Sequence, residues 1–288
     1  MDVTLTLKCN NKCNFCPRKK YLKIIAAHSK KEIFSDIKKT RKESNVIVLS
    51  GGEVTLLKDL KEIVLFCRKN KFLRVGIITN GRTLSDINFA KKLVFWGIND
   101  FGVSIYSHDK KIHDRITKSN GSLNQTKRGI ANMITLSKLF PIDVRINLVL
   151  NYWNYKSISK TLKVLYSWGA RSFTIAEQII ISKKTKHLSI QKIKACLDKV
   201  KKIRLPGASL HFRGFAPCFL HNKVILRRMD PFIKLETYEI DTTIKKRNQK
   251  HKYINKFKDL FQRLPRCKDC RYLNQCIGIQ KAYLNYED

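Results

Sequence analysis

Short apolar runs alternate with amphipathic helical patterns along the first two thirds of the chain, and this alternation constrains the fold more than any other feature. The strand-like runs cover residues 3–7, 46–49, 73–79, 102–106, 144–150 and 173–176. The helical patterns cover residues 29–43, 57–70, 84–96, 122–138, 155–168 and 189–203. Strict alternation is typical of a parallel sheet with right-handed crossovers. We therefore expect an α/β fold, a partial (β/α)6 barrel of the TIM type, because eight units would be needed to close the barrel.

The pattern changes near residue 205, where Pro206-Gly207 marks a turn. Short β-like pieces follow at 205–218, 223–228 and 234–241, and after them come a lysine-rich helical stretch at 242–264 and a group of cysteines. We expect a core domain over residues 1–203 and a small C-terminal domain over residues 204–288, built from a β-hairpin and a helix.

The chain is strongly basic, with 59 Lys and Arg against 22 Asp and Glu and a formal net charge of +37. A field of this size attracts polyanions, so nucleic acid is a candidate partner. The abundance of Lys, Ile and Asn would also follow from an AT-rich genome, and the basic residues are spread through every helical pattern. The charge therefore leaves both a functional and a compositional origin open.

Cysteine usage and hydropathy restrict the compartment. The chain has nine cysteines, and seven of them fall into two groups, which favours metal binding in a reducing cytoplasm over a disulfide framework. Cys67 and Cys196 lie on helical patterns and are expected to be ordinary core thiols. No run of about 18 apolar residues occurs, and the N-terminus lacks the layout of a secretory signal. We expect a cytoplasmic protein without a membrane segment.

The first group, Cys9, Cys13 and Cys16, follows the first strand-like run with the spacing Cys-x3-Cys-x2-Cys. Three thiolates on one loop can hold three irons of a [4Fe–4S] cluster and leave the fourth iron open for chemistry. A zinc site with a remote fourth ligand would use the same residues. The spacing alone leaves both metals open.

Polar residues and glycines follow the next three strand-like runs. Gly51, Gly52 and Glu53 end the second run, where glycines permit close approach of the backbone to a ligand and a carboxylate can accept a hydrogen bond from an ammonium group. Thr79-Asn80 ends the third run, and Ser104 lies near the end of the fourth. The carboxyl ends of barrel strands carry active sites, so we expect these groups to lie together.

The fifth run alternates, which places Arg145, Asn147 and Asn151 on one face. Polar groups on a buried strand need partners. In a barrel lumen these would be a cofactor carboxylate, a ribose or the substrate, whereas on an edge strand they would face solvent. Glu177 and Gln178, at the end of the sixth run, are expected to be polar lumen groups.

Together these motifs resemble the radical S-adenosylmethionine (radical SAM) superfamily: the cysteine spacing with an aromatic residue before the third cysteine, the Gly-Gly-Glu and Thr-Asn-Gly strand ends, and the serine on the fourth strand. The resemblance implies a cluster on the three cysteines whose open iron binds the methionine end of S-adenosylmethionine, and reductive cleavage to a 5′-deoxyadenosyl radical. The cofactor-binding residues expected from these motifs and from the fifth strand are Phe15, Gly51, Gly52, Glu53, Thr79, Asn80, Ser104, Arg145, Asn147 and Asn151.

The stretch from His113 to Ser122 resembles the "HD…TG…GS" segment of the peptide-modifying branch of that family. We interpret it as structural: a loop followed by the start of a helix, with Ser122 as the N-cap.

The second cysteine group is Cys267-x2-Cys270-x5-Cys276, with Cys218 upstream. Four thiolates could hold zinc or a second [4Fe–4S] cluster. The spacing resembles the SPASM or twitch region of radical SAM maturases, which favours a cluster. A complete SPASM region has more cysteines, so at most one auxiliary cluster fits here. If all four cysteines bind this cluster, each of its irons has a protein ligand and none is open to a substrate. Such a cluster would serve electron transfer or folding.

The resemblance implies an enzyme that abstracts hydrogen from a carbon of a peptide or protein substrate, and a reducing partner such as flavodoxin or ferredoxin. The short segment before Cys9 cannot form a leader-peptide-binding domain, which weakens the peptide assignment. The first alternative is the same chemistry on RNA, a nucleotide or a sugar. The second is a non-catalytic, zinc-bearing nucleic-acid-binding protein. The sequence specifies neither the substrate nor the oligomeric state.

Overall fold

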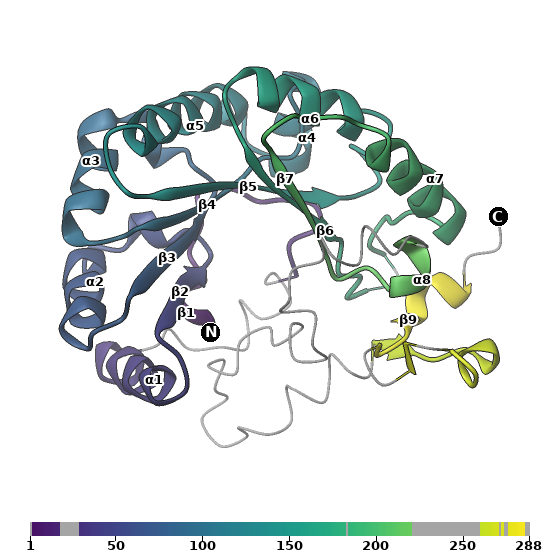
Figure 1. Ribbon diagram of the computed structural model, residues 1–288, viewed down its shortest axis with the longest axis horizontal. Helices are drawn as coiled ribbons and strands as arrows, with labels where there is room; N and C mark the ends of the chain where they lie inside the picture. Colours follow the sequence, from purple (N-terminus) through teal and green to yellow (C-terminus); the bar gives the residue numbers. More distant parts are fainter. Residues whose placement is uncertain are drawn as a thin grey trace.

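Seven parallel strands form one sheet in chain order, from β1 to β7. The computed structural model describes residues 2–17, 29–182, 184–220, 260–270, 272–273 and 276–285. The strands are β1 (Asp2–Thr6), β2 (Val46–Gly51), β3 (Arg74–Thr79), β4 (Asp100–Ser104), β5 (Asp143–Leu150), β6 (Ser172–Glu177) and β7 (Ser209–Arg213). The sheet curves, and the helices lie along its outer side (Figure 1). In this sheet β1 and β7 each pair with one neighbour, so it is an open, partial barrel.

Most crossovers between strands contain a helix on the outer face. The helices are α1 (Lys30–Glu43), α2 (Leu60–Lys69), α3 (Ile87–Trp96), α4 (Lys110–Thr117), α5 (Ser122–Ser137), α6 (Ile158–Ser167), α7 (Ile190–Lys201) and α8 (Pro217–Leu220). Local sequence sets the start of α1, where the Ser29 hydroxyl accepts from Glu32 N–H and the Glu32 carboxylate accepts from Ser29 N–H. None of the helices in the described part of the chain is long and apolar enough to cross a membrane.

The core lies between the sheet and these helices. Large apolar strand residues such as Ile47, Ile77 and Phe101 are fully buried, together with Ile63 on α2 and Leu93 on α3. Burying one such side chain contributes about 1.5–3 kcal/mol. The alternating strand positions face the lumen and are smaller or polar, which leaves that side for a site.

The sheet has one strand more than the sequence predicted. Residues 205–218 were assigned to the C-terminal region as a β-like piece, but Ser209–Arg213 pairs in parallel with β6 as β7. The preceding Pro-Gly turn suggested a change of domain, whereas it only ends the crossover from α7. The partial α/β barrel is confirmed with seven strands in place of six. The domain boundary between residues 203 and 204 stays a prediction, and the sheet itself extends past it.

Helix α4 was not predicted, and the prediction for Ser122 was wrong. Ser122 is the first residue of α5, and Gly121 is its N-cap. The Asp114 carboxylate caps this helix instead, because it accepts from the Ser122 hydroxyl at 2.8 Å and from the backbone N–H of Gly121 and Leu123. A carboxylate from α4 therefore satisfies donors that a local N-cap usually satisfies.

A two-stranded antiparallel hairpin, β8 (Phe261–Gln262) with β9 (Ile279–Gln280), follows near the C-terminus. The Gln280 side chain accepts from Ile180 N–H and donates to Gln178 O, both at 2.8 Å. These contacts dock the hairpin beyond the carboxyl end of β6. The β-like pieces predicted at 223–228 and 234–241 lie outside the described residues, as does the predicted lysine-rich helix up to residue 259.

Candidate functional site

The loop that follows β1 carries Cys9, Cys13 and Cys16 at the carboxyl end of the sheet. The three thiols lie near the Tyr106 side chain, two residues after β4: burial raises the pKa of Tyr106 well above its ordinary value, and the charges of Cys13, Cys16 and Cys9 raise it further. Phe15 is buried and meets the Tyr106 ring edge-on, with ring centroids 5.0 Å apart. Phe15 was expected to line the cofactor site, and the contact that the structure gives it is this packing of the loop on β4.

Helix α4 holds the second half of the cysteine loop. Lys12 N–H donates to Thr117 O at 2.8 Å, and Asn14 N–H donates to Ile116 O at 2.9 Å. The Asn14 side chain donates to Arg115 O at 3.0 Å. The last carbonyl groups of a helix have no partner within the helix, so this C-terminus is a natural place for a loop to bind.

The end of β2 holds the first half of the loop. Gly52 N–H donates to Thr6 O at 2.6 Å, and Glu53 N–H donates to Lys8 O at 2.8 Å. A Cβ atom on Gly51 would lie 2.2 Å from Thr6 O, and one on Gly52 would lie 2.1 Å from Lys8 O. The sequence suggested that a ligand approaches these glycines closely. In the structure, the chain's own cysteine loop makes that close approach.

Glu53 is fully buried and joins the ends of β2 and β3. One carboxylate oxygen accepts from the Thr55 hydroxyl at 2.6 Å and from the Thr79 hydroxyl at 2.7 Å, and the other accepts from Asn80 N–H at 2.7 Å. Burial raises the pKa of Glu53, and these hydrogen bonds oppose the increase. No Lys or Arg of the described residues forms an ion pair with it. Its carboxylate can therefore accept a cationic ligand.

Two N–H groups point at the Cys9 sulfur. Asn11 N–H donates to Cys9 Sγ at 3.3 Å, and the Asn80 side chain donates to it at 3.8 Å. Desolvation raises the pKa of Cys9, and the nearby Glu53 carboxylate and Cys16 thiol raise it further. A bound metal would deprotonate such a thiol. Hydrogen bonds to cluster sulfurs are a common feature of iron–sulfur sites, so this donor set fits a three-thiolate cluster.

The polar residues of β4 and β5 divide between the two ends of the sheet. Ser104 pairs with Asn147 in the register and hydrogen-bonds the Tyr106 hydroxyl, so both strand residues lie near the cysteine end. Asn151 is buried at the end of β5, where its side chain donates to Val149 O and accepts from Trp153 N–H, both at 3.0 Å. The Asn151 side chain shapes the loop after β5.

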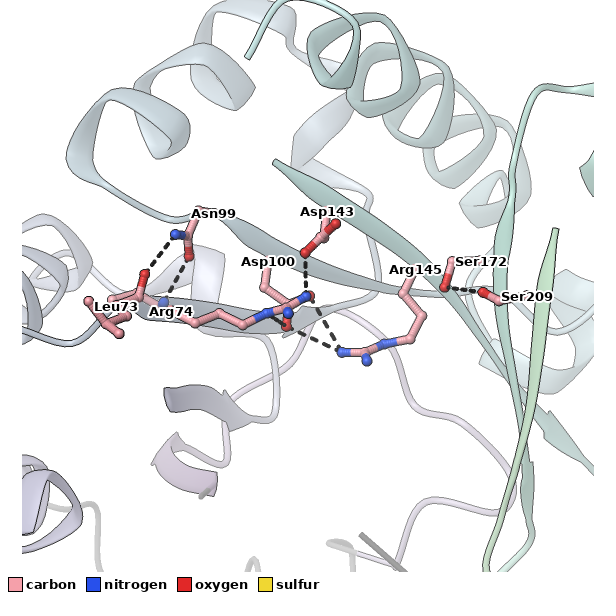
Figure 2. Close-up of polar contacts among 9 residues, drawn as sticks. Leu73, Arg74, Asn99, Asp100, Asp143, Arg145, Ser172 and Ser209 are labelled. Carbon is pink, nitrogen blue, oxygen red and sulfur yellow. Dashed lines mark hydrogen bonds and ion pairs between the residues drawn. The ribbon is translucent and has the colours of Figure 1, made fainter. Parts of the chain in front are cut away.

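The Arg145 side chain extends toward the other end of the sheet, where it meets the first residue of β4 (Figure 2). Its guanidinium contacts both carboxylate oxygens of Asp100, the first residue of β4, at 3.4 Å. Arg74 donates to the same carboxylate at 2.9 Å and also contacts Asp143. The structure therefore does not bring Arg145 to the cysteine site. The alternation of polar and apolar residues predicts which face of β5 carries Arg145. It does not predict toward which end of the strand the side chain extends.

The second cysteine group also gathers in space. Cys218 lies on α8, directly after β7, and Cys267 ends the short 3-10 helix η4 (Pro265–Cys267). Burial raises the pKa of Cys276, and the charges of Cys218, Cys267 and Cys270 raise it further, so all four thiols lie near one another. Four thiolates suit either zinc or a [4Fe–4S] cluster. Among the described residues, no three His, Cys, Asp or Glu side chains are arranged closely enough to hold a metal ion.

A small cavity lies at the carboxyl ends of β5 and β6, against the 3-10 helix η6 (Lys281–Asn285). Its lining residues include Asn151, Glu177, Gln178 and Tyr283. The Tyr283 hydroxyl donates to the Glu177 carboxylate at 2.6 Å. Gln178 donates to Lys186 O, and its side-chain oxygen is buried with no partner among the described residues. The structure thus places Glu177 and Gln178 where the C-terminal segment meets the barrel.

Sequence reasoning missed two contributors to the cysteine site, Arg82 and Tyr106. Arg82 directly follows the Thr-Asn-Gly strand end, and its guanidinium reaches the cysteine loop. Tyr106 ends the fourth strand-like run and was counted only as an apolar strand residue. Their position immediately after strands was the available signal, but their partners lie about 70 to 100 residues away in the chain.

Comparisons with known proteins give relatives and a fold. A probable GTP 3′,8-cyclase from Saccharolobus islandicus is 27% identical over 178 residues, which is 62% of this chain and 56% of that protein. A probable GTP 3′,8-cyclase from Methanocaldococcus jannaschii is 29% identical over 172 residues, 59% of this chain and 56% of that protein. The matched part thus spans little more than half the length of these relatives.

Solved structures share the fold. Streptococcus suis SuiB bound to S-adenosylmethionine has a TM-score of 0.58 at 16% identity, over 76% of this chain and 48% of SuiB. Native anSMEcpe with bound AdoMet has a TM-score of 0.56 at 19% identity, over 69% of this chain and 59% of that one. At these identities the likeness concerns the fold alone. The Radical SAM superfamily matches residues 3–165, which include the cysteine loop, the end of β2 and β5. The chain therefore belongs to the radical SAM superfamily and is a radical SAM enzyme, with S-adenosylmethionine and a [4Fe–4S] cluster as its cofactors.

Proposed function

We propose that Cys9, Cys13 and Cys16 hold the reactive cluster of this enzyme and that its substrate is a peptide or protein, from which a carbon-bound hydrogen atom is removed. One observation carries the assignment of the cluster: a single loop, hydrogen-bonded to both the end of β2 and α4, carries three thiols close to Tyr106 at the carboxyl end of the sheet. Membership of an enzyme superfamily excludes the alternative of a non-catalytic nucleic-acid-binding protein.

When bound, the cluster and S-adenosylmethionine supply a 5′-deoxyadenosyl radical that abstracts hydrogen. The chain's own residues bind and orient these groups. Glu53 accepts hydrogen bonds from the ammonium group of the methionine moiety, which supplies the positive charge that Glu53 lacks among its described neighbours. Asn80 and Ser104 line the cofactor on β3 and β4. Asn147 lies beside Ser104 in the sheet and extends this surface.

We further propose that Cys218, Cys267, Cys270 and Cys276 hold an auxiliary [4Fe–4S] cluster. Its support is the proximity of the four thiols together with the resemblance to auxiliary-cluster regions. With four protein ligands, this site would relay an electron between the substrate and a reducing partner of the flavodoxin or ferredoxin type.

The test of the reactive site is anaerobic reconstitution with iron and sulfide, followed by reduction with dithionite in the presence of S-adenosylmethionine. The wild type should form 5′-deoxyadenosine, and Cys13→Ala should form none above background. The matched control is Cys196→Ala, which removes a buried thiol on α7 and should keep the product. Undiminished product from Cys13→Ala would refute the assignment.

The auxiliary site is tested by metal content. Two clusters correspond to about eight irons per chain, and Cys270→Ala combined with Cys276→Ala should reduce this to about four. One equivalent of zinc beside about four irons in the wild type would show that the second site is a zinc site.

The peptide assignment is supported by two solved structures that share the fold: SuiB bound to the precursor peptide SuiA, and anSMEcpe bound to a peptide. The second candidate is a nucleotide, and the relatives named as probable GTP cyclases favour it. Deuterium transfer separates the two. Label entering 5′-deoxyadenosine from a deuterated peptide digest supports a peptide substrate, whereas label entering only from deuterated GTP supports the nucleotide.

A further inference from the structure

We propose that Arg82 is a positioning residue for the reactive cluster: its guanidinium holds the middle of the cysteine loop and places a fixed positive charge beside the cluster. The inference rests on the proposed assignment of the cluster to the three N-terminal cysteines. It concerns how the chain sets the position and the reduction potential of that cluster.

In the described part of the chain, hydrogen bonds from three places hold the cysteine loop: the end of β2, the C-terminus of α4 and the residues that follow β3. The end of β2 bonds the backbone of Thr6 and Lys8, before the first cysteine. The C-terminus of α4 bonds Lys12 and Asn14, which flank the second cysteine. Between them lie Asn10 and Asn11, which join Cys9 to Cys13.

Arg82 supplies the third contact. Its Nη1 atom donates to Asn10 O at 2.6 Å and to the Asn11 side-chain oxygen at 2.8 Å. The same nitrogen reaches the Ser119 hydroxyl at 2.9 Å, and Nε donates to the Gln125 side chain on α5 at 2.6 Å. The guanidinium therefore ties the loop both to α5 and to the turn that precedes it.

Asn80 orients this contact. Its side-chain oxygen accepts from the backbone N–H of Arg82 at 3.0 Å, and its side-chain nitrogen donates to the Asn10 side-chain oxygen at 2.6 Å and to Cys9 Sγ at 3.8 Å. Arg82 and Asn80 thus act on the same turn of the loop from the end of β3. A displacement of that turn would move Cys9 relative to Cys13.

The chemistry of the contact requires arginine. Its planar fork donates from Nε and Nη1 in fixed directions, whereas a lysine ammonium is a single point charge on a flexible stem. The charge matters separately, because the potential of an iron–sulfur cluster depends on the net charge and hydrogen bonds around it. A cation held next to the ligand loop favours the reduced, more negative state of the cluster.

The experiment compares Arg82→Gln and Arg82→Lys with Arg41→Gln, all reconstituted as full chains. Arg41 is a half-buried arginine on α1 whose Nε donates to Asn70 O at 2.9 Å, far along the chain from the cysteine loop. The measurements are the rate of iron loss to a chelator and the midpoint potential followed by the EPR signal of the reduced cluster. All of these proteins, including the wild-type reference, also carry Cys270→Ala and Cys276→Ala, so that the iron and the EPR signal come from the reactive cluster alone.

Loss of a group that orients a metal ligand typically costs about 10–100-fold in metal affinity. We expect Arg82→Gln to lose iron at least about tenfold faster than the wild type and to have a more negative potential. Arg82→Lys keeps the charge and loses the fork, so it should lose iron faster while its potential stays near that of the wild type. Arg41→Gln should match the wild type in both.

Equal iron loss and equal potential in Arg82→Gln and the wild type would overturn the inference. Thermal unfolding of the apo proteins tests whether a variant has lost its fold. If Arg82→Gln does not fold, the iron retention of Arg82→Lys becomes the test of the inference. Iron retention equal to that of the wild type in Arg82→Lys would refute the role of the guanidinium fork. Failure of the proposed function gives a different result, since Cys13→Ala would then keep the same cluster signal.

Discussion

Two buried carboxylates lie at opposite ends of the sheet, and their surroundings differ. Asp100, at the amino end, forms ion pairs with Arg74 and Arg145 (Figure 2). Glu53, at the carboxyl end, is surrounded by hydroxyl and backbone N–H donors, and no ion pair reaches it from the described residues. Burying a charge is costly unless it is paired. Asp100 is therefore compensated within the chain, whereas Glu53 is compensated only by neutral donors.

This difference separates a structural carboxylate from a candidate binding group. The Asp100 network joins the first residues of β3, β4 and β5 at the amino end of the sheet. Residues whose pKa is strongly perturbed by burial cluster at functional sites. The carboxyl end should therefore respond to mutation through the cofactor, and the amino end through stability.

The largest effect is expected from Gly52→Ala. A methyl carbon there would lie 2.1 Å from Lys8 O, so the end of β2 must separate from the cysteine loop and break the bonds from Gly52 and Glu53 to it. Iron binding at the N-terminal site and formation of 5′-deoxyadenosine should fall to background. Gly207→Ala is the control, because a Cβ atom there meets nothing within 4 Å although φ is +69°. Full iron content in Gly52→Ala would show that the close approach is dispensable.

Asp100→Asn should lower the free energy of unfolding by about 2 kcal/mol, because two arginines would lose their shared counter-ion. The affinity for S-adenosylmethionine should not change, since this network lies at the far end of the sheet. Chemical denaturation and equilibrium binding measure the two quantities. A weakened cofactor affinity at unchanged stability would reverse the comparison between the two ends.

Glu53→Gln should weaken binding of S-adenosylmethionine about tenfold, or about 1.4 kcal/mol, while the Thr55 and Thr79 hydroxyls keep a carbonyl oxygen to bond. Calorimetry on the reconstituted, unreduced enzyme measures this affinity. Thr83→Val is the matched control, because the Thr83 hydroxyl donates to Thr55 and not to Glu53. An unchanged affinity in Glu53→Gln would exclude Glu53 from cofactor binding.

The stability of the apo protein should also depend on pH through Glu53. Burial raises its folded pKa above the ordinary value of 4.5, so the protonated form is favoured in the folded state. The stability from this group is present below about pH 4.5 and is lost as the pH rises through the folded pKa. Apo Glu53→Gln should therefore be more stable than the apo wild type at pH 7, and the difference should disappear near pH 4.5. A difference that grows toward low pH would contradict the sign.

The smallest effect is expected from Ser172→Ala at the amino end. The Ser209 hydroxyl donates to Ser172 at 3.2 Å in an exposed position (Figure 2). Its loss should cost less than about 0.5 kcal/mol and leave cofactor binding unchanged. A cost as large as that of Asp100→Asn would mean that the β6–β7 contact is as important as the buried ion pairs.

The barrel could be predicted from the sequence because hydrophobic periodicity is a local property of the chain. The six predicted strands all occur in the sheet, and the strand-end motifs do lie at one edge. The β-like character of residues 205–218 was predicted, but the pairing of Ser209–Arg213 with β6 was not, because strand pairing depends on contacts between residues distant in the chain. Helix α4 was missed because the stretch that begins at His113 was interpreted as a loop leading into the next helix.

The candidate site also has features that the sequence predicted and features that only the structure revealed. The sequence by itself determined the three thiols, the carboxylate of Glu53 and their common edge, since these depend on residue type and on the direction of parallel strands. The tertiary structure decided that Gly51 and Gly52 accommodate the cysteine loop, that Arg82 holds its middle, and that Arg145 belongs to Asp100 at the other end of the sheet. The physical reason is that periodicity specifies the face of a strand, whereas partners are set by register and by the path of loops, which depend on contacts between residues distant in the chain.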